Sequence, residues 1–298
     1  MKDEKIDESG VVMESVPCAL CRETDAAPFM KARNIRQRGE REYDLVKCRS
    51  CGFVYLNPRP SKESISCYYV GTDTEKANRP PTLSERFYFG LFRRLPHKKA
   101  GSMLDVGCGS GRYIYLLKER GWDVKGVDLS FTEYGRDVLG VDIFEGGLTD
   151  AGYADGSFDV VTFWWTLEHM HDPVSVLKEA RRVLKKGGLL IVGVPNIESI
   201  EASVFKRNWF HLYIPKHINH FSQRSLDRML KIAGFEDVRI RHDMFSFGII
   251  GSIQCAFNSI NLKIDLRNPV WYLISLPLDM VMSMTRRSGL ITAYAVKR

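Results

Sequence analysis

The sequence predicts an α/β protein that is built on a doubly wound, mostly parallel sheet and carries a small N-terminal metal-binding module. Three observations support this prediction. From residue 102 onward, short apolar segments typical of buried strands alternate with helices of roughly 10–15 residues. A glycine-rich loop follows the first of these strands, and two Cys-x-x-Cys pairs lie upstream of it.

The expected elements follow from changes in the hydrophobic period along the chain. We expect strands at 103–106, 122–128, 142–145, 158–164, 189–194, 235–241 and 289–296, and helices at 111–120, 132–139, 173–184 and 222–233. The segment Lys185-Lys186-Gly187-Gly188 is typical of a helix end, because cations complement the helix dipole and glycine adopts the conformation needed just beyond the helix.

The composition is that of a folded protein. The chain of 298 residues has 44% hydrophobic and 27% charged residues, which excludes a disordered tail, a collagen-like repeat and a polytopic membrane protein. The net charge of +7 permits contact with phosphate groups or with an anionic membrane surface, but requires neither. Seven cysteines, an odd number, and a polar start without a signal-peptide pattern favour a reducing compartment, so we expect a cytoplasmic protein.

Four of the cysteines form two pairs with the spacing of metal ligands. A Cys-x-x-Cys turn aims two sulfurs at one ion, and two such turns complete a tetrahedral Zn²⁺ site. We therefore predict a zinc site with Cys18, Cys21, Cys48 and Cys51 as ligands, against the alternative of one redox-active pair. Gly52 suits the turn after the second pair, whereas Arg22 stands at the equivalent place after the first. The remaining cysteines are interpreted as packing residues.

The glycine loop at 105–111 is the main binding motif. Its glycines, Gly107, Gly109 and Gly111, allow the backbone to turn sharply and to approach a ligand at the start of the following helix. The spacing is G-x-G-x-G, and not the G-x-G-x-x-G of nicotinamide dinucleotide sites, because Arg112 occupies the last position of that pattern. Asp128 ends the second strand, where an acid can accept hydrogen bonds from ribose hydroxyls.

These residues, with several later segments, resemble the motif series of class I S-adenosylmethionine-dependent methyltransferases. The segments are Asp-Val-Gly-Cys-Gly-Ser-Gly at 105–111, Gly-Val-Asp at 126–128, Ser-Phe-Asp-Val-Val at 157–161, Leu-Glu-His at 167–169 and Lys-Gly-Gly-Leu-Leu at 186–190. They occur in the family's order and spacing over residues 100–241. The resemblance implies a Rossmann-like sheet of seven strands and S-adenosylmethionine as cofactor.

The same resemblance implies a set of cofactor-binding residues: Asp105, Gly107, Cys108, Gly109, Gly111, Asp128, Leu129, Leu148 and Trp164. In the family, Asp105 and the glycines would line the methionine and ribose, and Asp128 would hold the ribose diol. Leu129 and Leu148 would flank the adenine, and Trp164 would touch the methionine end. Many relatives carry an acid just after the third strand, where this chain has Gly147, and Asp150 is the nearest carboxylate.

Residues 46–60 resemble a bacterial subgroup of these enzymes that has an N-terminal zinc-ribbon-like module. In that subgroup the zinc is structural, and members often act on sugars attached to nucleotides, lipids or natural products. The expected division is a disordered leader (1–15), the zinc-binding module (16–60), a helical linker (61–100) and the cofactor-binding domain (101–298). Within that last domain we expect a substrate lid at 195–222 and an apolar helical insertion at 245–285.

The candidate catalytic residues are histidines and one acid. An insertion after the carboxyl end of a strand overhangs the ligand crevice of an open sheet, and the lid carries His217 and His220. Glu168 and His169 follow the fourth strand, near the expected position of the methyl group. An acceptor hydroxyl needs a base with a pKa near neutrality, which is histidine chemistry. Each of these residues could instead have a structural role.

The acceptor predicted by these features is a small molecule, phosphate-bearing or lipid-linked, and we favour a sugar. A quinone or other ring hydroxyl is the close alternative, because residues 167–173 also resemble quinone O-methyltransferases. An RNA methyltransferase is less favoured, since the arginines that would contact phosphates, at 33, 36, 38 and 41, alternate with acids. The apolar segment 269–284 is expected to pack in the core or a homodimer interface, with peripheral contact to the inner face of a membrane as the alternative.

Overall fold

A seven-stranded sheet forms the centre of this computed structural model, which describes residues 8, 10–36, 39, 41–69, 79–93, 95, 100–130, 132–260, 262, 264–266 and 269–298. Its strands are β6 (Ser102–Val106), β7 (Asp123–Asp128), β8 (Asp142–Glu145), β9 (Phe158–Trp164), β10 (Leu184–Pro195), β12 (Glu236–His242) and β13 (Leu290–Val296). Their order is β12-β13-β10-β9-β6-β7-β8, with β13 antiparallel to both neighbours and the other pairs parallel. The prediction of a mostly parallel, seven-stranded α/β sheet is confirmed.

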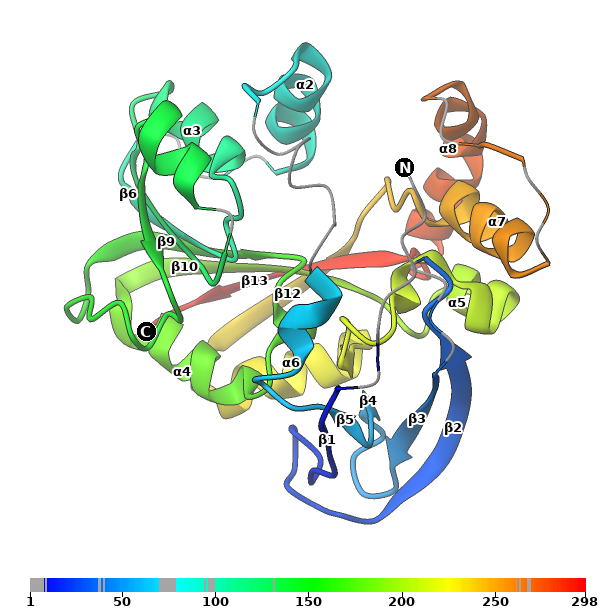
Figure 1. The fold of residues 1–298 in the computed structure, drawn as a ribbon. Helices are drawn as coiled ribbons and strands as arrows, with labels where there is room; N and C mark the ends of the chain where they lie inside the picture. The colour runs from blue at the N-terminus through cyan, green and yellow to red at the C-terminus, as the bar shows by residue number, and fades with distance from the viewer. Residues whose placement is uncertain are drawn as a thin grey trace.

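Helices cover both faces of this sheet, as Figure 1 shows: α3 (Arg112–Lys118) lies on one side, and α4 (Pro173–Val183) and α6 (Gln223–Ile232) lie on the other. The alternation of side chains along each strand produces two apolar cores. On β6, Leu104 belongs to the core under α4 and α6, whereas Met103 belongs to the core under α3. Helix α4 begins where Asp172 accepts a hydrogen bond from the main-chain nitrogen of Ser175.

Two local predictions differ from the structure. The expected helix at 132–139 is only a short π-helical turn, η2 (Tyr134–Val138), in which Gly135 lies close against the main chain of Ser110. The expected helix end at 185–188 is instead the first part of β10, because Leu184 already pairs with Phe158 and a bulge separates it from Leu189. Both differences are local and leave the sheet order unchanged.

The N-terminal module contributes a second sheet. The strands of this sheet are β2 (Ala26–Arg33), β3 (Glu42–Cys48) and β4 (Val54–Leu56), together with β11 (Asn219–His220) from the lid. The module has two further short strands, β1 (Met13–Glu14) and β5 (Arg59–Pro60). The order β11-β4-β3-β2 means that the lid supplies one edge of the module's sheet, while β1 pairs separately with β5. Residues 13–14, which we expected in a disordered leader, therefore form a paired strand.

The module also shares its apolar core with the large domain. Cys18, Cys48 and Phe53 belong to the same buried cluster as strands β9 and β10, and the ring of Phe53 lies 5.5 Å from that of Phe221. The linker that follows contains the short 3-10 helix η1 (Ile65–Tyr69) and α2 (Leu83–Phe92), whose first turn is closed by reciprocal hydrogen bonds between Thr82 and Glu85.

The lid and the apolar insertion fold as short helices. The elements are η3 (Leu167–His169), α5 (Ile200–Phe205), η4 (Lys206–Asn208), η5 (Phe210–Leu212), α7 (Gly248–Ser259) and α8 (Pro269–Met284). On α8, Asp279 and Met282 face inward, whereas Ile274, Leu278 and Met284 are exposed. No helix among the described residues is both long enough and apolar enough to cross a membrane.

A buried polar network connects the lid to the apolar insertion. Ser246 hydrogen-bonds to a carboxyl oxygen of Glu201 on α5 and, at 2.8 Å, to one of Asp279 on α8. The indole nitrogen of Trp209 donates to Glu201 at 3.3 Å. A hydroxyl group has only one proton to donate, so one of the two carboxyls must carry a proton of its own. Consistently, burial raises the pKa of Glu201 from 4.5 to about 7, and burial also raises that of Asp279.

We predict that this network makes the folding stability depend on pH. Because the folded-state pKa of Glu201 is raised, its stabilising contribution is complete below about pH 4.5 and is lost as the pH rises through about 7. The Glu201→Gln variant, which cannot ionise, should gain about 3 kcal/mol relative to the native chain between pH 4.5 and 8. Urea unfolding curves at several pH values measure this difference.

The matched control is Glu198→Gln, because Glu198 is an exposed acid in the same segment. The unfolding free energy of this variant should follow that of the native chain at each pH. A Glu201→Gln curve that runs parallel to the native one over this pH range would contradict the assignment.

Candidate active site

The glycine loop lies between the end of β7 and the segment after β9. Gly107 has φ +78°, and a Cβ atom there would lie 2.3 Å from Cγ2 of Thr166. Its nitrogen donates to the carbonyl of Val127 at 2.7 Å. Gly109 has φ +54°, but a Cβ atom there would meet nothing within 4 Å. The loop is therefore packed tightly on one side and borders open space at Gly109.

Two buried acids flank this loop. One oxygen of Asp128 accepts the Gly109 nitrogen at 2.7 Å, and the other accepts the Ser130 nitrogen at 3.1 Å. Asp105 is 3% exposed and accepts a hydrogen bond of 2.5 Å from the Thr162 hydroxyl. Burial raises the pKa of Asp105 to about 7 and also raises that of Asp128. The acids are held rigidly, and each oxygen keeps a lone pair for a ligand.

Two buried donor atoms lie beside Asp105. The guanidinium of Arg93 lies 5.2 Å from the ring of Trp164 and 4.4 Å from that of Trp165. Arg93 is close enough to Asp105 to lower its pKa against the effect of burial. Among the described residues, the buried Nε of Arg93 and Nε1 of Trp164 have no hydrogen-bond partner. Unpaired buried donors are costly, so a ligand that accepts hydrogen bonds would fit between them.

A cluster of one acid and two histidines lies after β9. Glu168 is 1% exposed, and its Oε1 lies 3.8 Å from Nε2 of His217 in the lid. The rings of His169 and His217 meet edge to face with centroids 4.6 Å apart. Burial raises the pKa of Glu168 to about 8, lowers that of His169 to about 4 and lowers that of His217. We call these three residues the Glu-His-His cluster.

The Glu-His-His cluster and Asp128 share one neighbour, Tyr69 of η1. Its hydroxyl lies 2.9 Å from Nδ1 of His169. Its pKa is raised first by burial and then by the charges of Tyr213, Glu168 and Asp128. Tyr69 is therefore within electrostatic range of both the Glu-His-His cluster and Asp128. Thr166, which contacts Gly107, adds a second link between the two groups along the chain.

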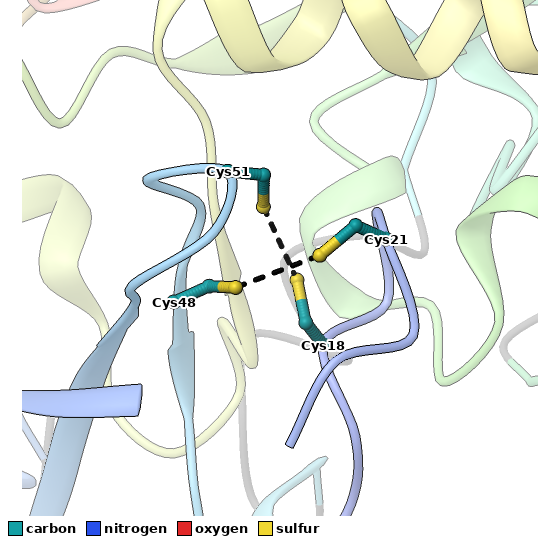
Figure 2. Close-up of side chains that lie close together, drawn as sticks. All are labelled: Cys18, Cys21, Cys48 and Cys51. Atoms are coloured by element: carbon teal, nitrogen blue, oxygen red, sulfur yellow. Dashed lines mark hydrogen bonds between the residues drawn. The ribbon is translucent and has the colours of Figure 1, made fainter. Parts of the chain in front are cut away.

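The four paired cysteines converge at one point, as Figure 2 shows. The sulfurs of Cys18 and Cys51 are 3.5 Å apart, and so are those of Cys21 and Cys48. Tetrahedral zinc with bonds of about 2.3 Å requires sulfurs about 3.8 Å apart, so the donor set fits such an ion. Arg22 and Gly52 each follow a pair with positive φ, 66° and 77°, and each donates its nitrogen to the carbonyl of the first cysteine in its pair. Arg22 thus adopts the turn for which we expected glycine.

Residues 82–240 match the family described as a methyltransferase domain. The chain belongs to this family. It is 30% identical over 169 residues to a protein of Mycolicibacterium smegmatis named probable S-adenosylmethionine-dependent methyltransferase, covering 53% of this chain and 62% of that protein. It is 31% identical over 160 residues to a ubiquinone biosynthesis O-methyltransferase of Idiomarina loihiensis, covering 48% of this chain and 65% of that enzyme. The chain thus spans less than two thirds of either relative.

Among solved structures, the fold is similar to that of Haemonchus contortus phosphoethanolamine N-methyltransferase 2, determined in complex with S-adenosyl-L-methionine. The TM-score is 0.52 at 17% sequence identity, with 82% of this chain and 62% of that chain covered. At this identity the likeness concerns the fold. The cysteine pairs lie outside the matched domain, which begins at residue 82.

Some side chains predicted to bind the cofactor or to act in catalysis are placed differently from what those roles require. Leu148 is 3% exposed and belongs to the core, so it is not free to flank an adenine, whereas Leu129 is 70% exposed. The sulfur of Cys108 points at β7, since a Cβ on Gly126 would lie 2.5 Å from it, and only the main chain of Cys108 can face a ligand. His220 lies on β11, where burial lowers its pKa to about 3, and it is not part of the Glu-His-His cluster.

Sequence reasoning missed Arg93, Tyr69 and Lys216 as members of the site. Lys216 is buried, and its ammonium lies 4.7 Å from the ring centre of Tyr69 and donates to the Tyr213 hydroxyl at 2.8 Å. These residues come from the linker and the lid, outside the strand-end motifs at 105–111, 126–128, 157–161, 167–169 and 186–190. The only available signal was the position of Lys216 directly before His217.

The surroundings of Gly107 and Gly109 predict that alanine destabilises the fold more at the first position than at the second. Gly107→Ala should lower the unfolding free energy by more than about 2 kcal/mol, because the new methyl group overlaps Thr166 and the backbone is left-handed. Gly109→Ala should cost only about 1 kcal/mol, from backbone strain alone. Thermal unfolding of both variants measures the difference, and equal destabilisation would contradict the packing described for this loop.

Proposed function

We propose that this protein is an S-adenosylmethionine-dependent methyltransferase that acts on a small molecule. One observation carries the proposal. Two buried acids, Asp105 and Asp128, and the unpaired donor atoms of Arg93 and Trp164 lie around the glycine loop. Tyr69 is within electrostatic range of both Asp128 and Glu168, so this group lies near the Glu-His-His cluster. Ligands bind at the carboxyl ends of parallel strands in open α/β sheets, and Asp105, Asp128 and Trp164 lie at the ends of β6, β7 and β9.

The residues around the loop fit the two ends of the cofactor. Its amino-acid end is a zwitterion, and the chain offers an acid, Asp105, for the ammonium and the donors of Arg93 and Trp164 for the carboxylate. Asp128 suits the ribose diol, because a carboxylate can accept two hydroxyl donors. The open space at Gly109 leaves room for a ligand to approach the main chain. The bound cofactor supplies a methyl group that its sulfonium already activates.

The acceptor would be held by the lid over the Glu-His-His cluster. The chain's part in the reaction is to align the acceptor, exclude water and receive the acceptor's proton if the acceptor is a hydroxyl. His169, His217 and His220 are buried with lowered pKa values, so each imidazole is neutral near pH 7 but is a weaker base than an exposed histidine. His220 has a buried Nε2 without a hydrogen-bond partner in the described part of the chain. Glu168 remains a further candidate base.

We favour a sugar of a surface-polysaccharide, glycolipid or nucleotide-sugar pathway as the acceptor. The polar surroundings of the cluster, with Tyr69, Tyr213 and Lys216, suit a hydroxylated molecule. The second candidate is a ring hydroxyl such as that of a quinone, favoured by the similarity to a ubiquinone biosynthesis O-methyltransferase.

The arginines that an RNA substrate would need are used within the protein. The guanidinium of Arg36 lies 3.8 Å from the ring centre of Phe210 and 3.9 Å from that of Tyr213, and it donates to the Phe210 carbonyl. Arg33 pairs with Glu42 at 3.6 Å, and Arg41 donates to Glu8. Residue 38 lies outside the described residues. Among the described arginines of this group, Arg33, Arg36 and Arg41, these contacts leave no row of free cations, which weighs against RNA.

We also propose a structural zinc ion at the four paired cysteines, on the support of their sulfur positions and their buried place in the shared core. For α8, the exposed apolar side chains weigh against simple core packing and leave a membrane surface or a second copy of the chain as the proposed contact. Arg286 and Arg287, both exposed, follow this face and would favour an anionic lipid surface.

The cofactor proposal predicts two losses of affinity. Asp128→Asn and Arg93→Met should each weaken S-adenosylmethionine binding by roughly 10-fold to 100-fold, since each removes hydrogen bonds that involve a charge. Isothermal titration calorimetry measures the affinity. Arg86→Met is the control, because Arg86 lies on the same helix but pairs with Glu119 on the surface. Native affinity in both variants would refute the assignment of the site.

Labelled methyl transfer into cell extract tests the acceptor. The label from S-adenosylmethionine should enter a small-molecule or lipid fraction that contains sugar, and should be resistant to ribonuclease. Label in a quinone fraction would support the second candidate instead, and label in RNA would overturn both.

The zinc proposal predicts that one tightly held zinc ion per chain disappears in Cys51→Ser. Loss of the ion should lower stability by several kcal/mol, because metal binding at such sites contributes directly to folding. Elemental analysis with thermal unfolding measures both effects. Cys67→Ser, which changes a cysteine outside the cluster, should retain the ion. A Cys51→Ser chain with native zinc content would contradict the proposal.

A further inference from the structure

We propose that Glu168, His169 and His217 bind a divalent transition-metal ion, at a site separate from the four cysteines. Each residue offers one ligand atom, and these atoms all lie within 4.8 Å of one another. Glu168 Oε1 and His217 Nε2 are 3.8 Å apart, close to the separation of about 3.4 Å between ligands in a tetrahedral site with bonds of about 2.1 Å. A small adjustment of side-chain torsions would complete the site.

The hydrogen bonds of the two imidazoles fix which nitrogen can bind a metal. Nδ1 of His169 lies 3.0 Å from the carbonyl of Lys216, and Nδ1 of His217 lies 2.8 Å from the carbonyl of His211. A carbonyl has no proton to donate, so a hydrogen bond to it requires the proton on Nδ1 in each ring. In His169 the Tyr69 hydroxyl, 2.9 Å from the same Nδ1, then accepts from that proton as well. Nε2 therefore holds the lone pair in both neutral rings. Histidine ligands are normally oriented in this way, by donation of the other ring nitrogen to a carbonyl or carboxylate.

The carboxylate of Glu168 provides the second, independent observation. Both of its oxygens are buried, and neither has a hydrogen-bond partner among the residues that the structure describes. The nearby ammonium of Lys216 donates to Tyr213 at 2.8 Å and not to Glu168. A buried acid with two unpaired oxygens beside two imidazole lone pairs is a set of acceptors without a donor. One cation can bind the carboxylate and both imidazole nitrogens at once. Without a cation, one of these three groups must take up a proton before it can donate a hydrogen bond to another.

The donor set indicates the class of ion. Two imidazole nitrogens and one carboxylate oxygen suit Zn²⁺, Mn²⁺, Fe²⁺ or Co²⁺, whereas Ca²⁺ and Mg²⁺ prefer oxygen ligands. Three protein ligands leave at least one position open, as in metal sites that bind a substrate. The inference that this position takes an oxygen of the acceptor, and so lowers the pKa of its hydroxyl, rests on the proposed methyltransferase function. Metal binding itself does not.

The experiment counts metal ions in the purified full-length chain after loading with zinc and removal of excess. We expect two zinc ions per chain, falling to one in Glu168→Gln, in His217→Gln and, by loss of the other site, in Cys51→Ser. After a chelator has removed the zinc ion from the Glu-His-His cluster, the chain should bind one Mn²⁺ ion, which avoids thiolate ligands, and electron paramagnetic resonance should detect it. The variants Glu168→Gln and His217→Gln should weaken Mn²⁺ binding by more than about 10-fold.

The control is His242→Gln, because this histidine is partly exposed and hydrogen-bonds to Gln223 away from the cluster. Circular dichroism and retention of the zinc ion at the cysteines check that each variant folds, and Glu168→Asp, which keeps the charge, should retain part of the Mn²⁺ affinity. One zinc ion per chain in the native protein, or Mn²⁺ binding unchanged in both variants, would overturn the proposal. S-adenosylmethionine affinity measured on the same samples reports separately on the proposed function.

Discussion

The main chain around Ile218 connects the three parts of the molecule that the sequence separates most widely. Its nitrogen donates to the carbonyl of Glu168 and its carbonyl accepts from Leu56, each at 3.0 Å. Directly after it, Asn219 and His220 pair with Tyr55 and Val54 of the cysteine module. Directly before it, His217 enters the Glu-His-His cluster. The position of the candidate site therefore depends on the fold of the cysteine module, because β4 of the module pairs with the lid strand that follows His217.

Further contacts strengthen the same connection. Arg59 of β5 donates to the carbonyl of His171, and Nε2 of His171 lies 3.1 Å from the carbonyl of Pro60. On the far side of the lid, Arg36 lies between the rings of Phe210 and Tyr213. Cation–π contacts of a partly desolvated guanidinium contribute about 1–2 kcal/mol each, more than most exposed ion pairs. Residues of the N-terminal module thus hold both the segment after β9 and the lid.

Five of the nine buried side-chain atoms without a hydrogen-bond partner in the described structure lie where a ligand is expected. Native proteins pair nearly all buried polar atoms, so each exception requires an explanation. Glu168, His220, Trp164 and Arg93 each have such an atom in the described structure, and all lie on or beside the edge formed by β9, the lid and α2. Elsewhere, the buried carboxyls of Glu201 and Asp279 have partners, whereas single atoms of Arg36, Arg41, Tyr55 and Asn208 do not. Glu168 is distinctive in that both of its carboxyl oxygens lack a partner.

The sequence by itself determined the sheet, the glycine loop, the acid at the end of the second strand and the set of four cysteines. Each of these depends on short-range features: hydrophobic period, the conformational freedom of glycine and the spacing of two residues in one turn. It also placed Glu168 and His169 at a strand end, where they are found.

Only the tertiary structure decided which lid histidine meets them, that Leu148 is buried in the core, and that Arg93 and Tyr69 reach the site. The physical reason is that these positions depend on how the linker and the lid fold back over the sheet. That path is set by contacts between residues far apart in the chain, such as those of Ile218 with Glu168 and Leu56, and no local pattern encodes them.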